Sequence, residues 1–317
     1  MTGLNGRHIL RAMRLTFRYN EVMNFRDKIS TLHRCFILPA AMVTLLAVSS
    51  VVTAVEPGAA VQERIDRQID NDKPIVVQVI VCLADNRYQG IAPLSPELGN
   101  GQIPSTNLYW GAKYGVMTFL SEEAGWEVVD TPKVVRPGML ESVVLKKKIR
   151  RGLFKRDVYL VAEAWEGEAI KAATKRFLAL AAGDSVTTVA VKKNDKTIRL
   201  AAGGAADIVA YVGHNGLMDF TLDSLPVQNA DALPRSAILL ANATKPYLQK
   251  YMKATGAHVL LWTTGVISPG AFTLDAAVES WIHGDNTREV LENVAETYSK
   301  YENCGAKAAR SLFEVEP

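Results

Sequence analysis

Four short apolar runs, each rich in β-branched residues or leucine, constrain the fold of this 317-residue chain most strongly. They cover residues 74–83, 207–212, 236–241 and 258–262. The last two runs are each followed by a helical pattern of apolar residues. Strands that alternate with amphipathic helices build βαβ units. The sequence therefore predicts one α/β domain over residues 74–317, with a mostly parallel sheet and helices on both faces.

Weaker patterns predict further elements of the same domain. Strands are predicted over residues 127–130, 142–149 and 157–165, and a hairpin over 185–191 and 196–200. Helices are predicted from Leu108 to Leu120 and from Ile170 to Leu180, and Asn286 with Glu289 forms a capping box for the last helix. A β-rich insertion is expected near residues 131–156 or 185–200.

Residues 1–54 have the pattern of an export leader. Seven Lys and Arg side chains fall in residues 1–35, and the uncharged segment 36–54 ends in small residues that suit signal-peptidase cleavage before Val55. An uncleaved membrane anchor is the alternative, because these 19 residues approach the ~20 that span a bilayer. In both cases we expect the domain to be exported, periplasmic or extracellular, with residues 55–73 as a connector or short helix.

The charge of the remaining chain gives no general case for binding nucleic acid, and we expect none. Removing the seven basic and two acidic residues of segment 1–35 leaves 29 basic and 31 acidic residues, so the rest carries a formal charge of −2. Lys146–Lys148 with Arg150, Arg151, Lys155 and Arg156 form one local basic run. We interpret this run as the solvated face of a hairpin, with a patch for an acidic polymer or anionic lipid as the alternative.

Cysteine usage is sparse and predicts no metal site. A disulfide between Cys82 and Cys304 is possible in an oxidising compartment, although a buried, unpaired Cys82 is the favoured interpretation. No metal-ligand spacing, phosphate-binding loop, dinucleotide fingerprint or serine-hydrolase motif is present in the sequence. The sequence therefore predicts no cofactor and no metal.

Polar side chains follow the predicted strands where a parallel sheet usually binds its ligands, beyond the carboxyl ends of the strands. These residues are Asp85, Asn86 and Arg87, then His214, Asn215 and Gly216, then Asn242 and Thr244, and finally Thr263, Thr264 and Gly265. Because the carboxyl ends of parallel strands meet at one edge, we expect a site there.

His214 is the strongest candidate for a general base at this edge, because imidazole titrates near neutral pH. It precedes Asn215 and Gly216, which predicts an exposed turn, and a structural turn histidine is the alternative. Asn242 lies between a strand and a helix beginning near Thr244. Backbone N–H groups at such a helix start bind anions, and a cap of the helix by Asn242 is the alternative. Thr263 or Thr264 could serve as a fallback nucleophile.

The loop after the first strand admits two interpretations as well. Arg87 could pair with a carboxylate of a ligand beside Asp85 and Asn86. A turn with a surface salt bridge is the favoured alternative, because Asp and Asn are common turn residues.

The stretch from about Pro74 to Ile282 resembles the caspase-like fold shared by caspases, legumains and gingipains. The resemblance rests on the apolar strand that ends at His214 and on the later strand that leads into position 242. It implies a three-layer sandwich, in which His214 matches the catalytic base and Asn242 occupies the position of the cysteine nucleophile. Asn215 also departs from the family, which commonly has glycine directly after the histidine. The chain is similar as well to uncharacterised exported bacterial proteins, which implies no activity.

Three functions are compatible with these residues. The first is an exported caspase-like domain without the cysteine nucleophile, a pseudo-peptidase that binds a peptide or protein partner at the strand ends. The second is a hydrolase of unknown substrate with His214 as general base and the amides near Asn242 as an oxyanion site. The third is a periplasmic domain that binds a small molecule.

Overall fold

The structure is a computed structural model that describes residues 57–90, 93–193, 196–230 and 232–316. The expected leader and its cleavage site therefore lie outside the described residues. Within the described ranges, no helix combines the length and the apolar character needed to cross a bilayer.

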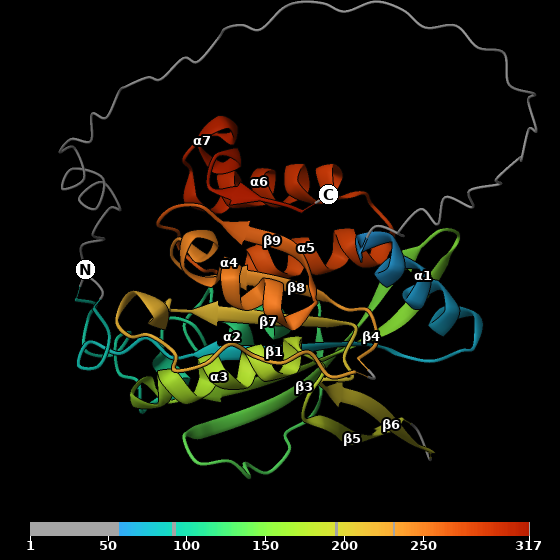
Figure 1. Cartoon of the computed structure of the whole chain (residues 1–317), viewed down its shortest axis with the longest axis horizontal. Helices are drawn as coiled ribbons and strands as arrows, with labels where there is room; N and C mark the ends of the chain where they lie inside the picture. Colours follow the sequence, from blue (N-terminus) through green and yellow to red (C-terminus); the bar gives the residue numbers. More distant parts are fainter. Residues whose placement is uncertain (1–56, 91–92, 194–195, 231, 317) are drawn as a thin grey trace, which may run out of the picture. The chain divides into compact units, whose positions relative to one another are not determined.

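An eight-stranded sheet forms the centre of the domain (Figure 1). Its strands, in spatial order, are β10 (Phe313–Glu314), β9 (His258–Thr263), β8 (Ser236–Leu240), β7 (Ile208–Gly213), β1 (Ile75–Cys82), β4 (Phe154–Trp165), β3 (Met139–Arg151) and β2 (Glu127–Asp130). The five strands from β9 to β4 are mutually parallel, and β10, β3 and β2 run antiparallel to their neighbours. The prediction of an α/β fold with a mostly parallel sheet is confirmed.

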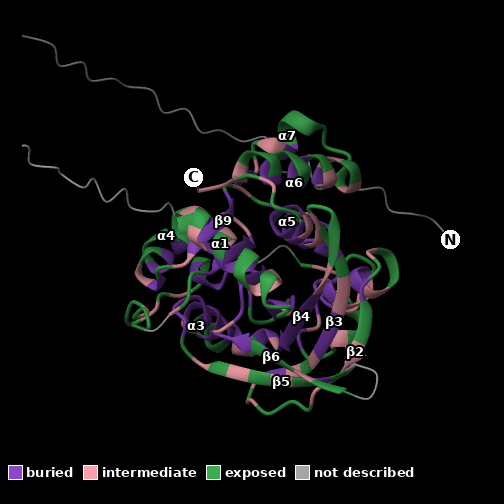
Figure 2. Cartoon of the chain, turned by 90° about the vertical axis from the view of Figure 1, so that its right-hand side faces the viewer, coloured by how far each residue is buried: buried purple, intermediate pink, exposed green. Residues whose placement is uncertain are grey.

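Helices cover both faces of this sheet, as the burial colours of Figure 2 make visible. The described residues form seven α-helices: α1 (Pro57–Asp70), α2 (Val116–Thr118), α3 (Ile170–Ala181), α4 (Thr244–Thr255), α5 (Ala271–His283), α6 (Thr287–Glu302) and α7 (Ala306–Arg310). Alternate residues of β1 enter different cores, because Val77 packs on the face covered by α1 and α5, and Val76 on the face covered by α3 and α4. β1 is buried along its whole length, as expected for a central parallel strand.

A second, two-stranded sheet is formed by β5 (Val186–Lys193) and β6 (Lys196–Gly203). It lies against β1, where the side chain of Gln78 accepts a hydrogen bond of 3.1 Å from the backbone N–H of Gly203. Of the two segments with a predicted β-rich insertion, 185–200 thus forms a separate sheet. Segment 131–156 belongs largely to the edge of the main sheet, through β3 and the start of β4.

The predicted helix from Leu108 to Leu120 is wrong for most of its length. The chain turns repeatedly up to Gly115, and only α2 and a π-helical turn, Phe119–Glu123, are helical. A Cβ placed on Gly111 would lie 2.1 Å from the carbonyl oxygen of Ser105, and one on Gly115 would lie 2.4 Å from that of Trp110. These two glycines allow backbone segments to approach more closely than a helix would.

Helix α1 closes the edge of the sheet at which the parallel strands begin. Arg64 of α1 forms an ion pair of 3.1 Å with Asp207 and donates hydrogen bonds to the carbonyls of Ala205 and Pro234 at 2.6 and 2.7 Å. Burial raises the pKa of Asp207, and the neighbouring Arg64 acts against this shift. The expected connector, of which residues 57–70 form α1, is therefore a helix packed on the domain.

Candidate functional site

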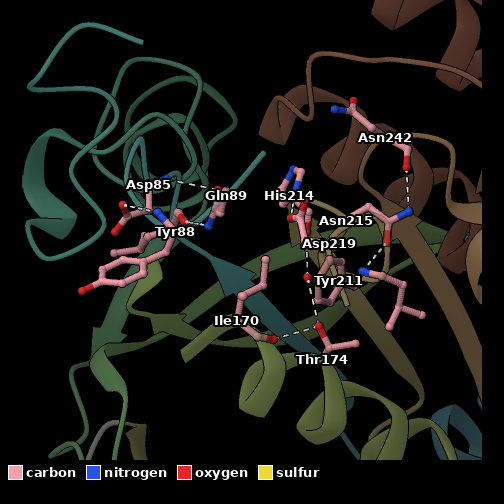
Figure 3. A network of polar contacts seen from close by, with 12 residues as sticks. Asp85, Tyr88, Gln89, Ile170, Thr174, Tyr211, His214, Asn215, Asp219 and Asn242 are labelled. Carbon is pink, nitrogen blue, oxygen red and sulfur yellow. Dashed lines mark hydrogen bonds and ion pairs between the residues drawn. The ribbon is translucent and has the colours of Figure 1, made fainter. Parts of the chain in front are cut away.

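The polar residues that follow the parallel strands lie at one edge of the sheet, as the strand pairing requires. Cys82 at the end of β1 pairs with Gly213 at the end of β7, and Val212 pairs with Leu240 at the end of β8. Figure 3 shows the side chains that follow these strands, from Asp85 through His214 and Asn215 to Asn242. The geometry of each decides what this edge can do chemically.

His214 is buried, which contradicts the prediction of an exposed turn. Its side chain is 1% exposed, and its Nε2 atom lies 2.6 Å from Oδ2 of Asp219. The Nδ1 atom is buried without a hydrogen-bond partner among the described residues. Asp219 is not among the site residues predicted from the sequence. The only sign of it in the sequence is that an acidic residue stands five positions after His214.

Gly213 fixes the direction in which the chain leaves β7. Its φ is 132°, and a Cβ at this position would lie 2.3 Å from the carbonyl oxygen of Cys82. The hydroxyl of Tyr211 donates a 2.7 Å hydrogen bond to the backbone carbonyl of His214, the residue after Gly213, and so fixes the position of its backbone. Only glycine fits between β1 and the histidine, so the burial of His214 follows from the backbone.

Asn215 connects the ends of β7 and β8. Its side-chain amide donates a 2.8 Å hydrogen bond to the backbone carbonyl of Asn242, and its Oδ1 accepts one from the N–H of Leu217. Gly216, another predicted site residue, is buried against Phe220, 2.7 Å from where its Cβ would lie. Both residues therefore have structural contacts that explain their types.

Asn242 is half-buried, and its Oδ1 accepts a 3.0 Å hydrogen bond from the N–H of Ile267. The next residue, Ala243, has a left-handed conformation with φ 48° and ψ 48° and is the N-cap of α4, without a side-chain cap. The helix expected to begin near Thr244 does begin there, with Thr244 as its first residue and not as its cap. A left-handed alanine costs about 1–2 kcal/mol, so the turn stores strain beside Asn242.

The two threonines after β9 hold the backbone together. Thr263 is fully buried, its hydroxyl lies 2.9 Å from that of Thr244, and it donates a hydrogen bond to the carbonyl of Ala241. Thr264 is exposed and donates to the carbonyl of Ser311 at 2.9 Å. Neither hydroxyl contacts His214 in the described structure, so the arrangement of an activated threonine is absent there.

Asp85 is the buried acid at this edge, with 5% of its surface exposed. Its Oδ1 accepts hydrogen bonds from the N–H groups of Arg87 and Tyr88, at 2.7 and 3.2 Å, which closes a local turn. Two glycines surround it, because a Cβ on Gly101 or Gly167 would lie 2.1 Å from an atom of the Asp85 side chain. The loop backbone is thus packed directly around this carboxylate.

The neighbouring residues form the turn that the favoured interpretation predicts. Asn86 binds both backbone groups of Leu94, at 2.9 and 3.0 Å. The guanidinium of Arg87 is exposed, lies 5.0 Å from the ring centre of Tyr88, and has no ion pair with any described carboxylate. The turn is confirmed, whereas the expected surface salt bridge is not found among the described residues.

A hollow of about 490 Å³ opens beside this loop, beyond the ends of β1 and β4. Its lining includes Asp85, Glu166 and Glu168 but only one cation, Arg87. The same loop also contacts Asp219, the partner of His214, because a Cβ on Gly90 would lie 2.7 Å from Oδ1 of Asp219. The hollow is therefore polar and acidic on balance, and the loop that forms one of its sides also contacts Asp219 through Gly90.

Cys82 is close to His214 in the fold and is nevertheless chemically inert. It is fully buried, and burial raises the pKa of its thiol to about 12, although a hydrogen bond with Tyr211 acts in the opposite direction. Cys82 and the exposed Cys304 are both free, so the possible disulfide between them is not formed. Within the described residues, no three His, Cys, Asp or Glu side chains are placed to hold a metal ion.

Comparison of the chain with family models, curated proteins and solved structures finds no match. The functional assignment therefore rests on the strand-end geometry, where the contact between the buried His214 and Asp219 and a strained turn after Asn242 lie at the ends of adjacent strands.

Proposed function

We propose that this chain is an exported caspase-like domain that binds a peptide or protein partner at the strand ends and does not cleave it. The observation that carries the proposal is the pairing of β7 and β8, which brings His214 and Asn242 to adjacent strand ends. The hydrogen bond from Asn215 to the carbonyl of Asn242 adds to this support, because it joins the residue next to His214 to position 242.

The chemistry of the strand ends favours binding over catalysis. Asn242 is no nucleophile at ordinary pH, and its Oδ1 is occupied by the N–H of Ile267. The thiol of Cys82 is protonated and buried, and the hydroxyl of Thr263 is bound to backbone and to Thr244. The ring of His214 is covered, which removes the solvent access that a general base for peptide hydrolysis needs.

The acidic hollow supports a partner that presents a cationic group. Its volume of about 490 Å³ is large enough for one extended side chain and part of its backbone. Oδ1 of Asp85 is satisfied within its own turn, so the exposed Glu168 and the half-buried Glu166 are the carboxylates that a bound lysine or arginine would meet. A peptide with a basic side chain is thus the ligand class that fits best.

Hydrolysis with His214 as the base is the second candidate, and the His214–Asp219 contact favours it. A carboxylate within 2.6 Å of an imidazole nitrogen orients the ring and fixes its tautomer, as it does for catalytic histidines. Movement of the loop that carries Asp219 would have to expose the ring. The third candidate, a small-molecule binding domain, would use the same acidic hollow.

Binding titrations of the full chain with fluorescent peptide libraries test the proposal. Peptides with a central arginine or lysine are expected to bind at least about tenfold more tightly than their glutamine counterparts, because one charge pair is lost in the latter. Glu168→Gln should weaken the basic peptides by a similar factor. The matched control is Glu122→Gln, which removes an exposed carboxylate elsewhere on the domain.

Three results would count against this function. Equal affinity for basic and neutral peptides would exclude the cationic ligand, and the absence of any peptide binding would exclude the proposal. Peptide cleavage by the natural chain that disappears in His214→Gln would establish the hydrolase instead. An Asn242→Cys variant that gains cleavage would support the caspase-like arrangement of positions 214 and 242.

A further inference from the structure

The turn between β3 and β4 exposes two large apolar side chains at its apex. Only Gly152 and Leu153 separate the paired residues Arg151 and Phe154, and Gly152 has the φ of 58° that such a tight turn favours. Leu153 is 87% exposed and Phe154 is 62% exposed. Two adjacent apolar side chains at a hairpin apex contribute little to the core and are available to a partner.

Basic side chains surround this apex. Arg150 and Lys155 lie directly opposite each other on the two strands, both are exposed, and neither has a carboxylate within ion-pair distance in the described chain. Like charges in a cross-strand pair are unfavourable, so this pair is not explained by stability. The guanidinium of Arg156 lies 5.2 Å from the ring centre of Phe154, next to the apex.

The rest of the basic run is neutralised within the domain. Lys146 and Lys148 share Asp157, at 3.6 and 3.7 Å, and Arg151 forms an ion pair of 2.7 Å with Asp66 of α1. Lys147 binds Asp275 and Glu279 of α5 at 3.2 and 2.7 Å. The interpretation of the run as a solvated hairpin face therefore holds for these four residues, and the unpaired charge is concentrated at the apex.

We propose that this apex, formed by Arg150, Gly152, Leu153, Phe154 and Lys155, docks on the surface of an anionic lipid bilayer. Leu153 and Phe154 enter the boundary between headgroups and acyl chains, where an aliphatic and an aromatic side chain are both favourable. Arg150 and Lys155 meet the phosphates of the headgroups from opposite strands. Each basic residue near such a surface adds an attraction that salt screens.

A bilayer fits this combination better than a nucleic acid does. A nucleic-acid site would present its charges along a groove with aromatic rings for stacking, whereas here the apolar pair forms the most exposed point. The apex belongs to the start of β4, and the acidic hollow lies beyond the end of that strand. The apex and α1 lie on one side in Figure 1 and the arrowhead of β7 on the other, so this proposal is independent of the peptide-binding function.

Vesicle flotation with residues 53–317 tests the proposal, since Thr53–Pro317 form a compact unit of their own. This fragment lacks most of the apolar segment 36–54, which could otherwise bind the vesicles itself. The domain should bind phosphatidylcholine vesicles that contain phosphatidylglycerol and not vesicles of phosphatidylcholine alone. Arg150→Gln with Lys155→Gln should weaken binding by roughly tenfold or more, as should Leu153→Ser with Phe154→Ser. Added salt should weaken binding of the natural domain and affect the double glutamine variant less.

Two matched controls keep the result specific to the apex. Lys250→Gln with Lys253→Gln removes two exposed charges from α4, and Leu225→Ser with Val227→Ser removes two exposed apolar side chains from another loop. Both controls should bind as the natural domain does. Absence of binding, equal binding to neutral vesicles, or equal loss in the controls and the apex variants would overturn the proposal. Unchanged thermal midpoints of all variants exclude unfolding as the cause.

Discussion

The Nε2 atom of His214 and the Oδ2 atom of Asp219 are 2.6 Å apart, although one residue is buried and the other is partly open to solvent. The contact folds the short helical turn Gly216–Met218 back onto the end of β7. Such a contact contributes to stability, because removal of the carboxylate would leave the buried imidazole nitrogen without a hydrogen-bond partner.

We expect a double-mutant cycle with His214→Gln and Asp219→Asn to show this coupling. Each single variant should lower the free energy of unfolding by about 1–3 kcal/mol, and the double variant should lose less than the sum of the two. Urea denaturation followed by circular dichroism measures the three differences. Strict additivity would mean that the two side chains do not stabilise each other.

Gly213→Ala tests the close contact between β7 and β1. The new Cβ would lie 2.3 Å from the carbonyl oxygen of Cys82, in addition to the cost of a positive φ for alanine. Gly125→Ala is the matched control, because Gly125 also has a positive φ but no atom within 4 Å of the point that its new methyl group would occupy. The Gly213 variant should lose at least about 2 kcal/mol more than the control in denaturant titrations. Equal losses would show that the strands separate easily.

Removal of Asp207 tests the charged network under α1. Asp207→Ala leaves the buried Arg64 without its partner and removes the acceptor for the N–H of Val76, so we expect a loss of about 3–5 kcal/mol. Glu63→Ala breaks the exposed ion pair with Arg67 on the same helix and should cost less than about 1 kcal/mol. Thermal and urea unfolding of both variants give the comparison.

His258 should make the domain less stable in mild acid. Burial lowers the pKa of its imidazole from 6.5 to about 4, so the unfolded chain binds a proton in this pH range that the folded chain does not. The corresponding stabilisation is complete above pH 6.5 and decreases as the pH falls toward 4, by at most about 3 kcal/mol. His258→Gln should remove this part of the pH dependence, and His283→Gln, at an exposed position, should not.

Thiol labelling distinguishes the two described cysteines. With Cys82 buried and its pKa raised to about 12, alkylating reagents at neutral pH should modify Cys304 and leave Cys82 intact in the folded chain. Mass spectrometry of the two peptides before and after unfolding in urea provides the measurement. Labelling of both at similar rates in the native state would contradict the burial of Cys82.

The sheet was predictable because each central strand carries its own signal. The runs that became β1, β7, β8 and β9 are mostly apolar, with Gln78 as the one polar residue in the interior of β1, and this is the pattern of strands buried on both faces. Local patterns also placed the capping box of Asn286 and Glu289. By contrast, the helix predicted around Gly111 does not form, because the chain there folds closely onto the backbone of Ser105 and Trp110 just before it, and apolar spacing does not reveal such contacts.

The candidate site was predictable in position but not in detail. The order of strands and helices determines that Asp85, His214 and Asn242 follow parallel strands at one edge. The burial of His214 depends on the φ of Gly213 and on a contact with Asp219, neither of which leaves a pattern in the sequence. The structural use of Thr263 likewise appears only when Thr244 is placed beside it.

The common direction of the five parallel strands gives this domain two chemically unlike ends. One end carries the acidic hollow and the His214 loop, and the other carries the apex at Leu153 and the ion pair between Asp66 and Arg151. A biotin or gold label attached through Leu153→Cys in residues 53–317, which lack Cys35, with the exposed Cys304 replaced by serine, would therefore immobilise the molecule in one orientation. Sensor-surface experiments prepared in this way would present every copy with its hollow toward the flowing solution.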